Sequence, residues 1–221
     1  MNLSLDEWNV WFHAKSADAK IMADPSWKTA PHLLEDVYTF EDALMVGLIL
    51  ITFLKNSDRL KMACMAQLVN VIAPIMTDDE RGAYRQSIYY PLLHASKYGR
   101  GVALRTILIS GKHDTSAHEE VTDIDAAVVY QEEKEEVTVF AVNRHIDEDV
   151  FFEADLRCFG GYEVLEYVIM ENENKKAVNT LDEEKVKPYR KKDYKMEQGN
   201  FSTIIKSCSW NVIRLGKKHT D

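Results

Sequence analysis

The strongest hydrophobic pattern in the chain is an apolar run at residues 43–51, within a predicted helix over residues 39–55. The helix begins at Thr39-Phe40-Glu41-Asp42, where acidic side chains follow the threonine as in a capping box. The run is apolar on every face, but it is far shorter than the roughly 20 residues of a membrane-spanning helix. We therefore expect a helix packed between two other parts of the protein, and no membrane span.

The residues on either side of this helix indicate alternating strands and helices. A short strand is predicted at residues 3–9, followed by an irregular segment over residues 10–38. A continuous apolar run at residues 59–67 predicts a buried strand of a parallel sheet. A second helix is predicted at residues 84–98, ending at Gly99-Arg100-Gly101. The first part of the chain therefore has the pattern βαβα.

The pattern changes after Gly101 to short segments, several of which alternate apolar and polar residues as half-buried antiparallel strands do. These segments are residues 126–130, 137–143, 150–156, 162–170, 201–206 and 209–215. A charged turn joins two of them at residues 131–136, and the polar residues 171–198 predict a long surface excursion. We expect an α/β part at residues 1–98 and an all-β part at residues 99–221 with two packed antiparallel sheets.

Composition and charge restrict the class of function. The chain has 221 residues, 46% hydrophobic and 29% charged, which is typical of a globular protein with one large or two small domains. The formal net charge of −9 argues against nucleic-acid binding, which needs a basic face. Three cysteines without paired spacing are expected to be reduced and mostly buried, which suits the cytoplasm. No zinc-type cluster, metal site or cofactor is indicated, and the N-terminal residues do not form a signal peptide.

The candidate chemistry lies in the sequence Asp6-Glu7-Trp8-Asn9-Val10-Trp11, at the end of the first predicted strand. Flat indole rings can bind the apolar face of a sugar, and a carboxylate beside them can attack or stabilise an anomeric carbon. A glutamate beside a tryptophan is more often a salt-bridged or solvated strand end. The residues alone therefore leave both interpretations open. A chain that begins inside a strand is also expected to be a fragment.

Three blocks resemble the α-L-arabinofuranosidases of glycoside hydrolase family 51. Residues 5–12 are similar to the nucleophile strand of that family, and residues 65–77 to its eighth barrel strand and following loop. Residues 88–101 are similar to its last barrel helix, and residues 210–215 agree more loosely. The blocks occur in the family's order and at about its spacing, so the resemblance covers essentially the whole chain.

The resemblance implies the last two β/α units of a (β/α)8 TIM barrel followed by a jelly-roll-like antiparallel β-sandwich. It implies that Glu7 is the nucleophile of a retaining mechanism and that Trp11 and Gln67 bind the substrate. Core packing for Trp11 and a structural amide for Gln67 remain the alternatives, and no role is assigned to Asp6, Trp8 or Asn9. The family's acid/base is a glutamate in a Gly-Asn-Glu motif, which this sequence lacks. The chain alone is therefore expected to be nearly inactive.

The implied function is hydrolysis of terminal α-L-arabinofuranosyl residues from arabinose-containing oligosaccharides, by a cytoplasmic enzyme that forms homo-oligomers, hexamers in this family. Two other classes of function are kept. One is a non-catalytic carbohydrate-binding or interaction module, against which Glu7, Trp11 and Gln67 argue together. The other is a different retaining barrel glycosidase, against which residues 66–77 argue.

Overall fold

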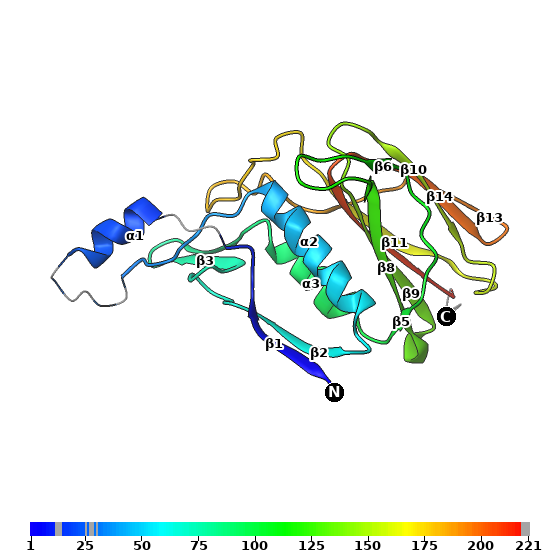
Figure 1. Cartoon of the computed structure of the whole chain (residues 1–221), viewed down its shortest axis with the longest axis horizontal. Coiled ribbons are helices and arrows are strands. Elements are labelled where there is room, and N and C mark those ends of the chain that lie inside the picture. The colour runs from blue at the N-terminus through cyan, green and yellow to red at the C-terminus, as the bar shows by residue number, and fades with distance from the viewer. Residues whose placement is uncertain (12–14, 25, 27–28, 30, 218–221) are drawn as a thin grey trace.

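The computed structural model, which describes residues 1–11, 15–24, 26, 29 and 31–217, changes from mixed α/β to antiparallel β as the sequence predicts (Figure 1). The first part contains β1 (Leu3–Trp8), α1 (Lys15–Met22), α2 (Phe40–Lys55), β2 (Leu60–Met65), β3 (Ile75–Asp78), β4 (Gly82–Arg85) and α3 (Tyr89–Tyr98). The second contains β5 (Val102–Leu104), β6 (Lys112–His113), β7 (Val121–Thr122), β8 (Ile124–Gln131), η1 (Glu132–Lys134), β9 (Glu136–Asn143), β10 (Val150–Asp155), β11 (Glu163–Met170), β12 (Tyr189–Arg190), β13 (Lys195–Glu197), β14 (Asn200–Ile205) and β15 (Ser209–Gly216).

Strands β1 and β2 are parallel neighbours, as predicted, and α2 connects them. The capping box that begins α2 is formed: the Thr39 amide donates to Asp42 over 2.7 Å, and the Asp42 amide donates to Thr39 Oγ1 over 3.5 Å. The prediction that β2 is buried is wrong, because its four central residues are exposed. Among the described residues β2 pairs only with β1, so most of its surface faces solvent.

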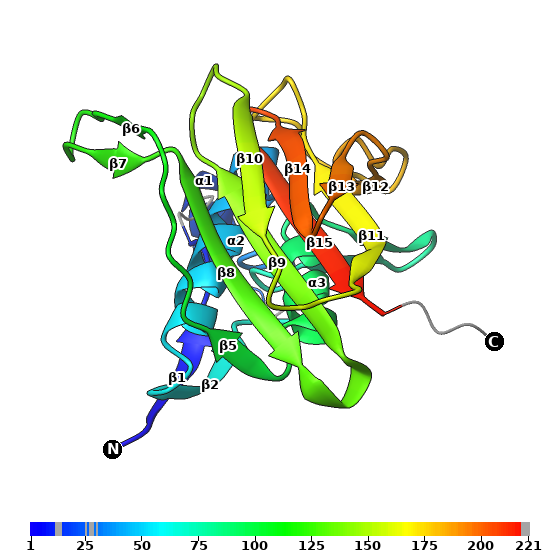
Figure 2. The same cartoon turned by 90° about the vertical axis from the view of Figure 1, so that its right-hand side faces the viewer.

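A six-stranded sheet, in the order β12-β11-β15-β9-β8-β5, carries α2 and α3 on one face (Figure 2). The core between them contains Phe40, Val46 and Ile51 of α2 and Phe140 and Trp210 of the sheet, all nearly or fully buried. The apolar helix over residues 39–55 is therefore packed between the β1–β2 ribbon and this sheet, as expected. Because the helices share their core with the sheet, the division into domains at residue 98 stays a prediction.

A second, three-stranded sheet, β10-β14-β13, covers the other face of the six-stranded sheet (Figure 2). Its Phe152 and Phe201 pack against Tyr167, Ile213 and Leu215 of the larger sheet. This confirms the predicted pair of packed antiparallel sheets. Strands β9 and β15 are buried almost throughout because α2 and α3 cover one face and the small sheet covers the other.

Trp210 of β15 joins the sheet to both helices. Its fully buried ring stacks on Phe140, and its Nε1 donates a hydrogen bond to His94 Nδ1 of α3 over 3.0 Å. The ring also fills the space beside Gly47 of α2, where an added Cβ would lie 2.7 Å from it. A single indole thus fixes the position of two helices on the sheet.

Four predictions of local structure are wrong. The segment predicted as irregular contains α1, and the helix predicted at residues 84–98 begins only at Tyr89, because residues 82–85 form the second strand of the β3–β4 hairpin. Residues 171–198 are not all at the surface: Ala177, Asn179 and Val186 are buried. Two of the three cysteines, Cys64 and Cys158, are exposed, although all three are free.

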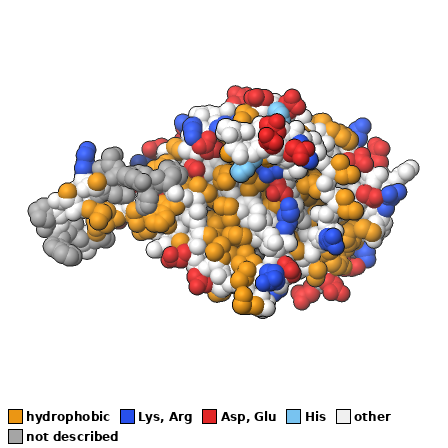
Figure 3. All heavy atoms as spheres, in the orientation of Figure 1, with side chains coloured by type: hydrophobic (Ala, Val, Ile, Leu, Met, Phe, Trp, Pro, Cys, Tyr) orange, Lys and Arg blue, Asp and Glu red, His pale blue; other side chains and the backbone are white. Residues whose placement is uncertain are grey.

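Hydrophobic side chains gather on the surface over β1 and the adjoining part of α2 (Figure 3). Leu3 and Met62 of the ribbon and Met45 of α2 are each about half exposed. An apolar face of this kind marks a surface that binds another part of a protein. No helix in the described part of the chain is both long and apolar enough to cross a membrane.

We predict that Gly47→Ala destabilises the protein by roughly 1–2 kcal/mol. The added methyl group collides with the buried Trp210 ring, and such overpacking costs about 1–3 kcal/mol, which outweighs the 0.5–1 kcal/mol that alanine normally contributes to a helix. Denaturant unfolding measures the change. Gly160→Ala, where an added Cβ meets no atom within 4 Å, is the matched control. A Gly47→Ala variant as stable as the wild type would contradict the proposed tight contact.

A second prediction concerns acid stability. Burial lowers the pKa of His94 from 6.5 to about 4, because a buried imidazolium loses hydration, while Glu166 raises the pKa slightly and Lys97 lowers it. The unfolded state therefore binds the proton first, and the stability that neutral His94 contributes is fully present above pH 6.5. It is lost as the pH falls from 6.5 towards 4, by roughly 3 kcal/mol in total.

The matched variant is His94→Gln, which retains an acceptor for the Trp210 indole but cannot titrate. Unfolding free energies of both proteins, measured between pH 7 and 4, should show a shallower decrease for His94→Gln. Equal slopes would show that His94 does not remain neutral in the folded protein.

Candidate active site at the ends of strands β1 and β2

The carboxyl ends of β1 and β2 lie at the same edge of the ribbon, because the strands are parallel. Leu5 pairs with Ala63 and Trp8 with Met65, with an irregularity in register between Leu5 and Trp8. The connections to α2 and α3 leave from this edge. In barrel enzymes such connections build the active site, so the position agrees with the predicted site.

Glu7 lies within that irregular segment, and its side chain is exposed. The next residue, Trp8, packs edge-on against Phe53 of α2, with ring centroids 4.9 Å apart. Glu7 is thus exposed at the carboxyl end of β1, whereas its neighbour Trp8 packs on the helix side of the ribbon.

Asn9 fastens the end of β1 to the segment after β2. Its Nδ2 donates to the carbonyl oxygens of Ala66, over 2.9 Å, and Ile72, while its Oδ1 accepts from the Val10 amide over 2.8 Å. The Ala66 amide in turn donates to the Trp8 carbonyl over 3.0 Å. Trp8 and Asn9 therefore connect the end of β1 to α2 and to the segment after β2.

Gln67 follows β2 directly, after a cis peptide bond between Ala66 and Gln67, and its side chain is exposed. Trp11 is 54% exposed, which disfavours the alternative that it is a core residue. Within the described part of the chain, neither Glu7 nor Gln67 hydrogen-bonds another residue through its side chain. Glu7, Trp11 and Gln67 thus come from one edge of the ribbon, and their convergence on one sugar stays a prediction.

The buried side chain of Gln86 joins the segment before α2 to the segment after β2. Nothing in the sequence singles this residue out. Gln86 Oε1 accepts from the Tyr38 amide over 2.9 Å, and Nε2 donates to the carbonyls of Asp36 and Ala73 over 2.9 and 2.8 Å. Residues 36 and 38 precede α2, and residue 73 follows β2. This side chain therefore positions both segments that lead from the candidate site.

The β-sandwich also reaches this end of the molecule through the segment after β11. The Phe40 amide donates to the Ala177 carbonyl over 2.9 Å, and the Glu41 amide donates to the Lys175 carbonyl over 3.0 Å. Two of the free amides at the start of α2 are thereby satisfied by the sandwich. Asn179 fixes the same segment: its Nδ2 donates to the Arg85 carbonyl over 3.0 Å.

The arrangement can supply one nucleophilic carboxylate, an indole and an amide to a neutral sugar. A retaining glycosidase needs a second carboxyl group about 5–5.5 Å from the first, and no Gly-Asn-Glu sequence occurs in the chain to provide the family's version. No group of three or more His, Cys, Asp or Glu side chains among the described residues could hold a metal ion.

Comparisons with known proteins show the family and the fold of the chain. Residues 6–209 match the family model for the α-L-arabinofuranosidase C-terminal domain. Intracellular exo-α-(1→5)-L-arabinofuranosidases from Acetivibrio thermocellus and Halalkalibacterium halodurans are 52% and 54% identical over 97% and 99% of the chain. In both cases the chain spans only 43% of the relative's length.

Among solved structures, a family 51 α-L-arabinofuranosidase from Bifidobacterium longum superposes with a TM-score of 0.88 at 31% identity. The match covers 98% of the chain and 43% of that protein. The GH51 enzyme from Thermotoga petrophila has a TM-score of 0.77 at 20% identity over 96% of the chain and 43% of its own, which supports the fold.

We predict that Gln86→Met destabilises the protein by roughly 3 kcal/mol or more. Methionine keeps the volume but leaves the Tyr38 amide and the carbonyls of Asp36 and Ala73 buried without their partner, at about 1–3 kcal/mol for each buried group. Thermal or denaturant unfolding measures the loss. The same substitution at exposed Gln67 should change stability by less than about 0.5 kcal/mol. Equal losses of stability at the two positions would show that the Gln86 side chain does not hold these segments in place.

Proposed function

Because the chain belongs to the α-L-arabinofuranosidases of glycoside hydrolase family 51, we propose that it provides the nucleophile part of an active site that removes terminal α-L-arabinofuranosyl residues from oligosaccharides. The observation that carries the proposal is the position of Glu7. Glu7 is exposed and lies at the carboxyl end of β1, beside the end of β2. A neutral sugar also suits a chain whose net charge of −9 would repel anionic substrates.

The proposed reaction retains configuration. Glu7 attacks the anomeric carbon of the terminal sugar, the glycosidic bond breaks, and a glycosyl ester forms on the Glu7 carboxylate. A second carboxylic acid gives its proton to the leaving oxygen and then takes one from the water that hydrolyses the ester. Since the chain spans 43% of its relatives' length, we assign this acid to the part of the whole enzyme outside the match.

Trp11 and Gln67 are the proposed substrate contacts. The Trp11 ring, 54% exposed, presents a flat apolar surface to the carbon face of the sugar. The Gln67 amide can donate to and accept from sugar hydroxyl groups. The relatives at 52% and 54% identity are named for the α-(1→5) linkage, so we propose the same linkage for the substrate of this protein.

The proposed compartment is the cytoplasm, because these relatives are named intracellular and the three cysteines are free. We also propose that the whole enzyme is a homo-oligomer, a hexamer by its resemblance to the family. Light scattering of the whole enzyme tests the assembly, and a monomer would contradict it.

Hydrolysis of an aryl α-L-arabinofuranoside tests the assignment of Glu7. The 221-residue chain should act barely above background, because general acid assistance is worth about 10²–10⁴-fold and the open site admits water. The whole enzyme should turn over, and Glu7→Gly in it should lose nearly all activity. Adding azide to that variant should form an arabinofuranosyl azide of inverted configuration, because azide occupies the place of the missing carboxylate.

Glu80→Ala, at an exposed turn between β3 and β4, is the matched control and should leave turnover unchanged. Robust hydrolysis by the 221-residue chain would show that the second acid lies within it. Full activity of the Glu7→Gly enzyme would remove Glu7 as the nucleophile.

A further inference from the structure

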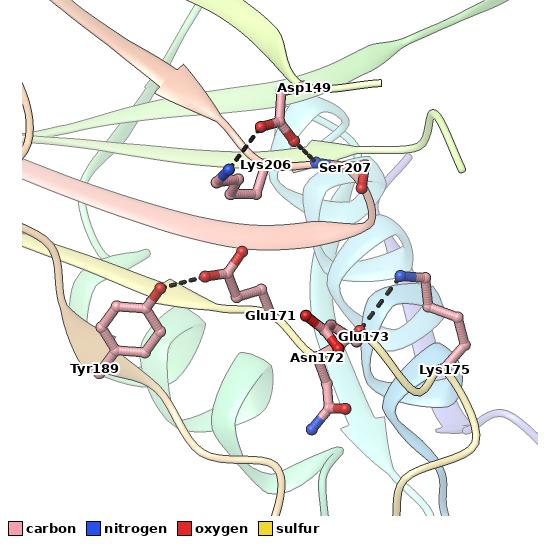
Figure 4. A pocket seen from close by; sticks show the side chains of 8 residues that line it. All are labelled: Asp149, Glu171, Asn172, Glu173, Lys175, Tyr189, Lys206 and Ser207. Carbon is pink, nitrogen blue, oxygen red and sulfur yellow. Dashed lines mark hydrogen bonds and ion pairs between the residues drawn. The ribbon is translucent and has the colours of Figure 1, made fainter. Parts of the chain in front are cut away.

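A cavity of about 650 Å³ lies in the sandwich, at the end where β9, β11 and β14 finish (Figure 4). Its volume is within the roughly 300–1,000 Å³ of typical ligand sites. Tyr189 of β12 and the segments that precede β10 and follow β11 and β14 contribute to the wall. The lining residues are Asp149, Glu171, Asn172, Glu173, Lys175, Tyr189, Lys206 and Ser207.

Hydrogen bonds and ion pairs within the protein hold the wall in place. Asp149 accepts from Lys206 Nζ over 2.7 Å and from the Ser207 amide over 2.9 Å, and these contacts lower the pKa of the Asp149 carboxyl. The Tyr189 hydroxyl donates to Glu171, and the two side chains point toward one another (Figure 4). Side chains fixed before binding lose little conformational entropy when a ligand arrives.

The chemistry of the wall fits a neutral polyhydroxylated ligand. Ammonium and amide donors alternate with carboxylate acceptors, and each sugar hydroxyl can both donate and accept. Three carboxylates beside two ammonium groups disfavour a phosphate or another anion. Tyr189 is 47% exposed and offers part of a ring to the apolar face of a sugar.

The wall also reaches the end of the molecule at which Glu7 lies. Lys175 lines the cavity, and its carbonyl accepts from the Glu41 amide at the first turn of α2. Since α2 follows β1, its first turn lies at the carboxyl end of the ribbon. A sugar chain bound in the cavity would therefore lie towards the same end of the protein as the catalytic site.

We propose that this cavity is a second carbohydrate site, which binds a segment of an α-(1→5)-linked arabinofuranosyl chain away from Glu7. The identity of the sugar rests on the proposed function, whereas the class of ligand rests on the wall itself. Tyr189 supplies the ring surface, and Glu171, Glu173 and Lys206 supply hydrogen bonds. The site would hold long substrates against the enzyme without taking part in the reaction.

Isothermal titration of the 221-residue chain with linear α-(1→5)-arabinotetraose tests the proposal. We expect a dissociation constant in the millimolar range, weakened about tenfold by Tyr189→Ala and less by Tyr189→Phe, which keeps the ring. Glu173→Ala, in an exposed loop, should also weaken binding. Glu133→Ala, on the turn at the opposite end of β9, should leave binding unchanged.

Several outcomes would overturn the proposal. They are absence of binding, binding lost in Trp11→Ala but kept in Tyr189→Ala, and equal affinity for xylotetraose. Circular dichroism of each variant must match the wild type, and Glu173→Ala decides the matter if Tyr189→Ala does not fold. Hydrolysis of the aryl arabinofuranoside is measured separately, so loss of the second site and loss of the proposed activity are distinguishable.

Discussion

The placement of the candidate site depends on one buried indole. Trp210 extends from the centre of the six-stranded sheet and fills the space beside Gly47 of α2. The N–H of its indole ring donates a hydrogen bond to His94 of α3. In the chain, α2 lies between β1 and β2, and α3 follows β2 after the β3–β4 hairpin. Whatever fixes the helices on the sheet also fixes the segments that carry Glu7 and Gln67. The constraint is steric on one side of the ring and polar on the other, so neither helix can slide independently of the sheet.

The sandwich also supports the end of the molecule that carries the candidate site, through the segment after β11. Backbone carbonyls of Lys175 and Ala177 accept from the first amides of α2. Asn179 reaches across to the Arg85 carbonyl, close to the start of α3. Free amides at a helix start must find acceptors when they are buried. The polar segment at residues 171–198 therefore supports the α/β region. Its hydrogen bonds join the sandwich to the α/β region at this end of the molecule.

The sequence predicts the order of the elements well, because the spacing of apolar and polar residues indicates the type of element in α2, β8, β9, β11 and β15. It fails where tertiary contacts decide. Residues 82–85 become a strand because they pair with β3, although an aromatic and aliphatic helix follows directly. Ala177 and Val186 are buried because they pack in the core between α2 and the six-stranded sheet, which composition does not reveal. For the site, the motif selects Glu7, Trp11 and Gln67, but nothing in the pattern distinguishes Gln86, whose three backbone partners come from distant segments.

The ribbon itself explains why the chemistry needs more protein around it. Glu7 and Met62 are both exposed, so the proposed nucleophile and an apolar side chain both lie on a pair of strands that is largely uncovered. In a closed (β/α)8 barrel, layers of side chains fill the interior and the catalytic groups sit at its carboxyl rim. Closure of that kind removes water from the carboxylate, which strengthens its interaction with the positive charge that develops on the sugar. The same closure would bury the apolar surface of β1 and β2. One event would therefore improve both the packing of these strands and the interaction of the carboxylate with the sugar.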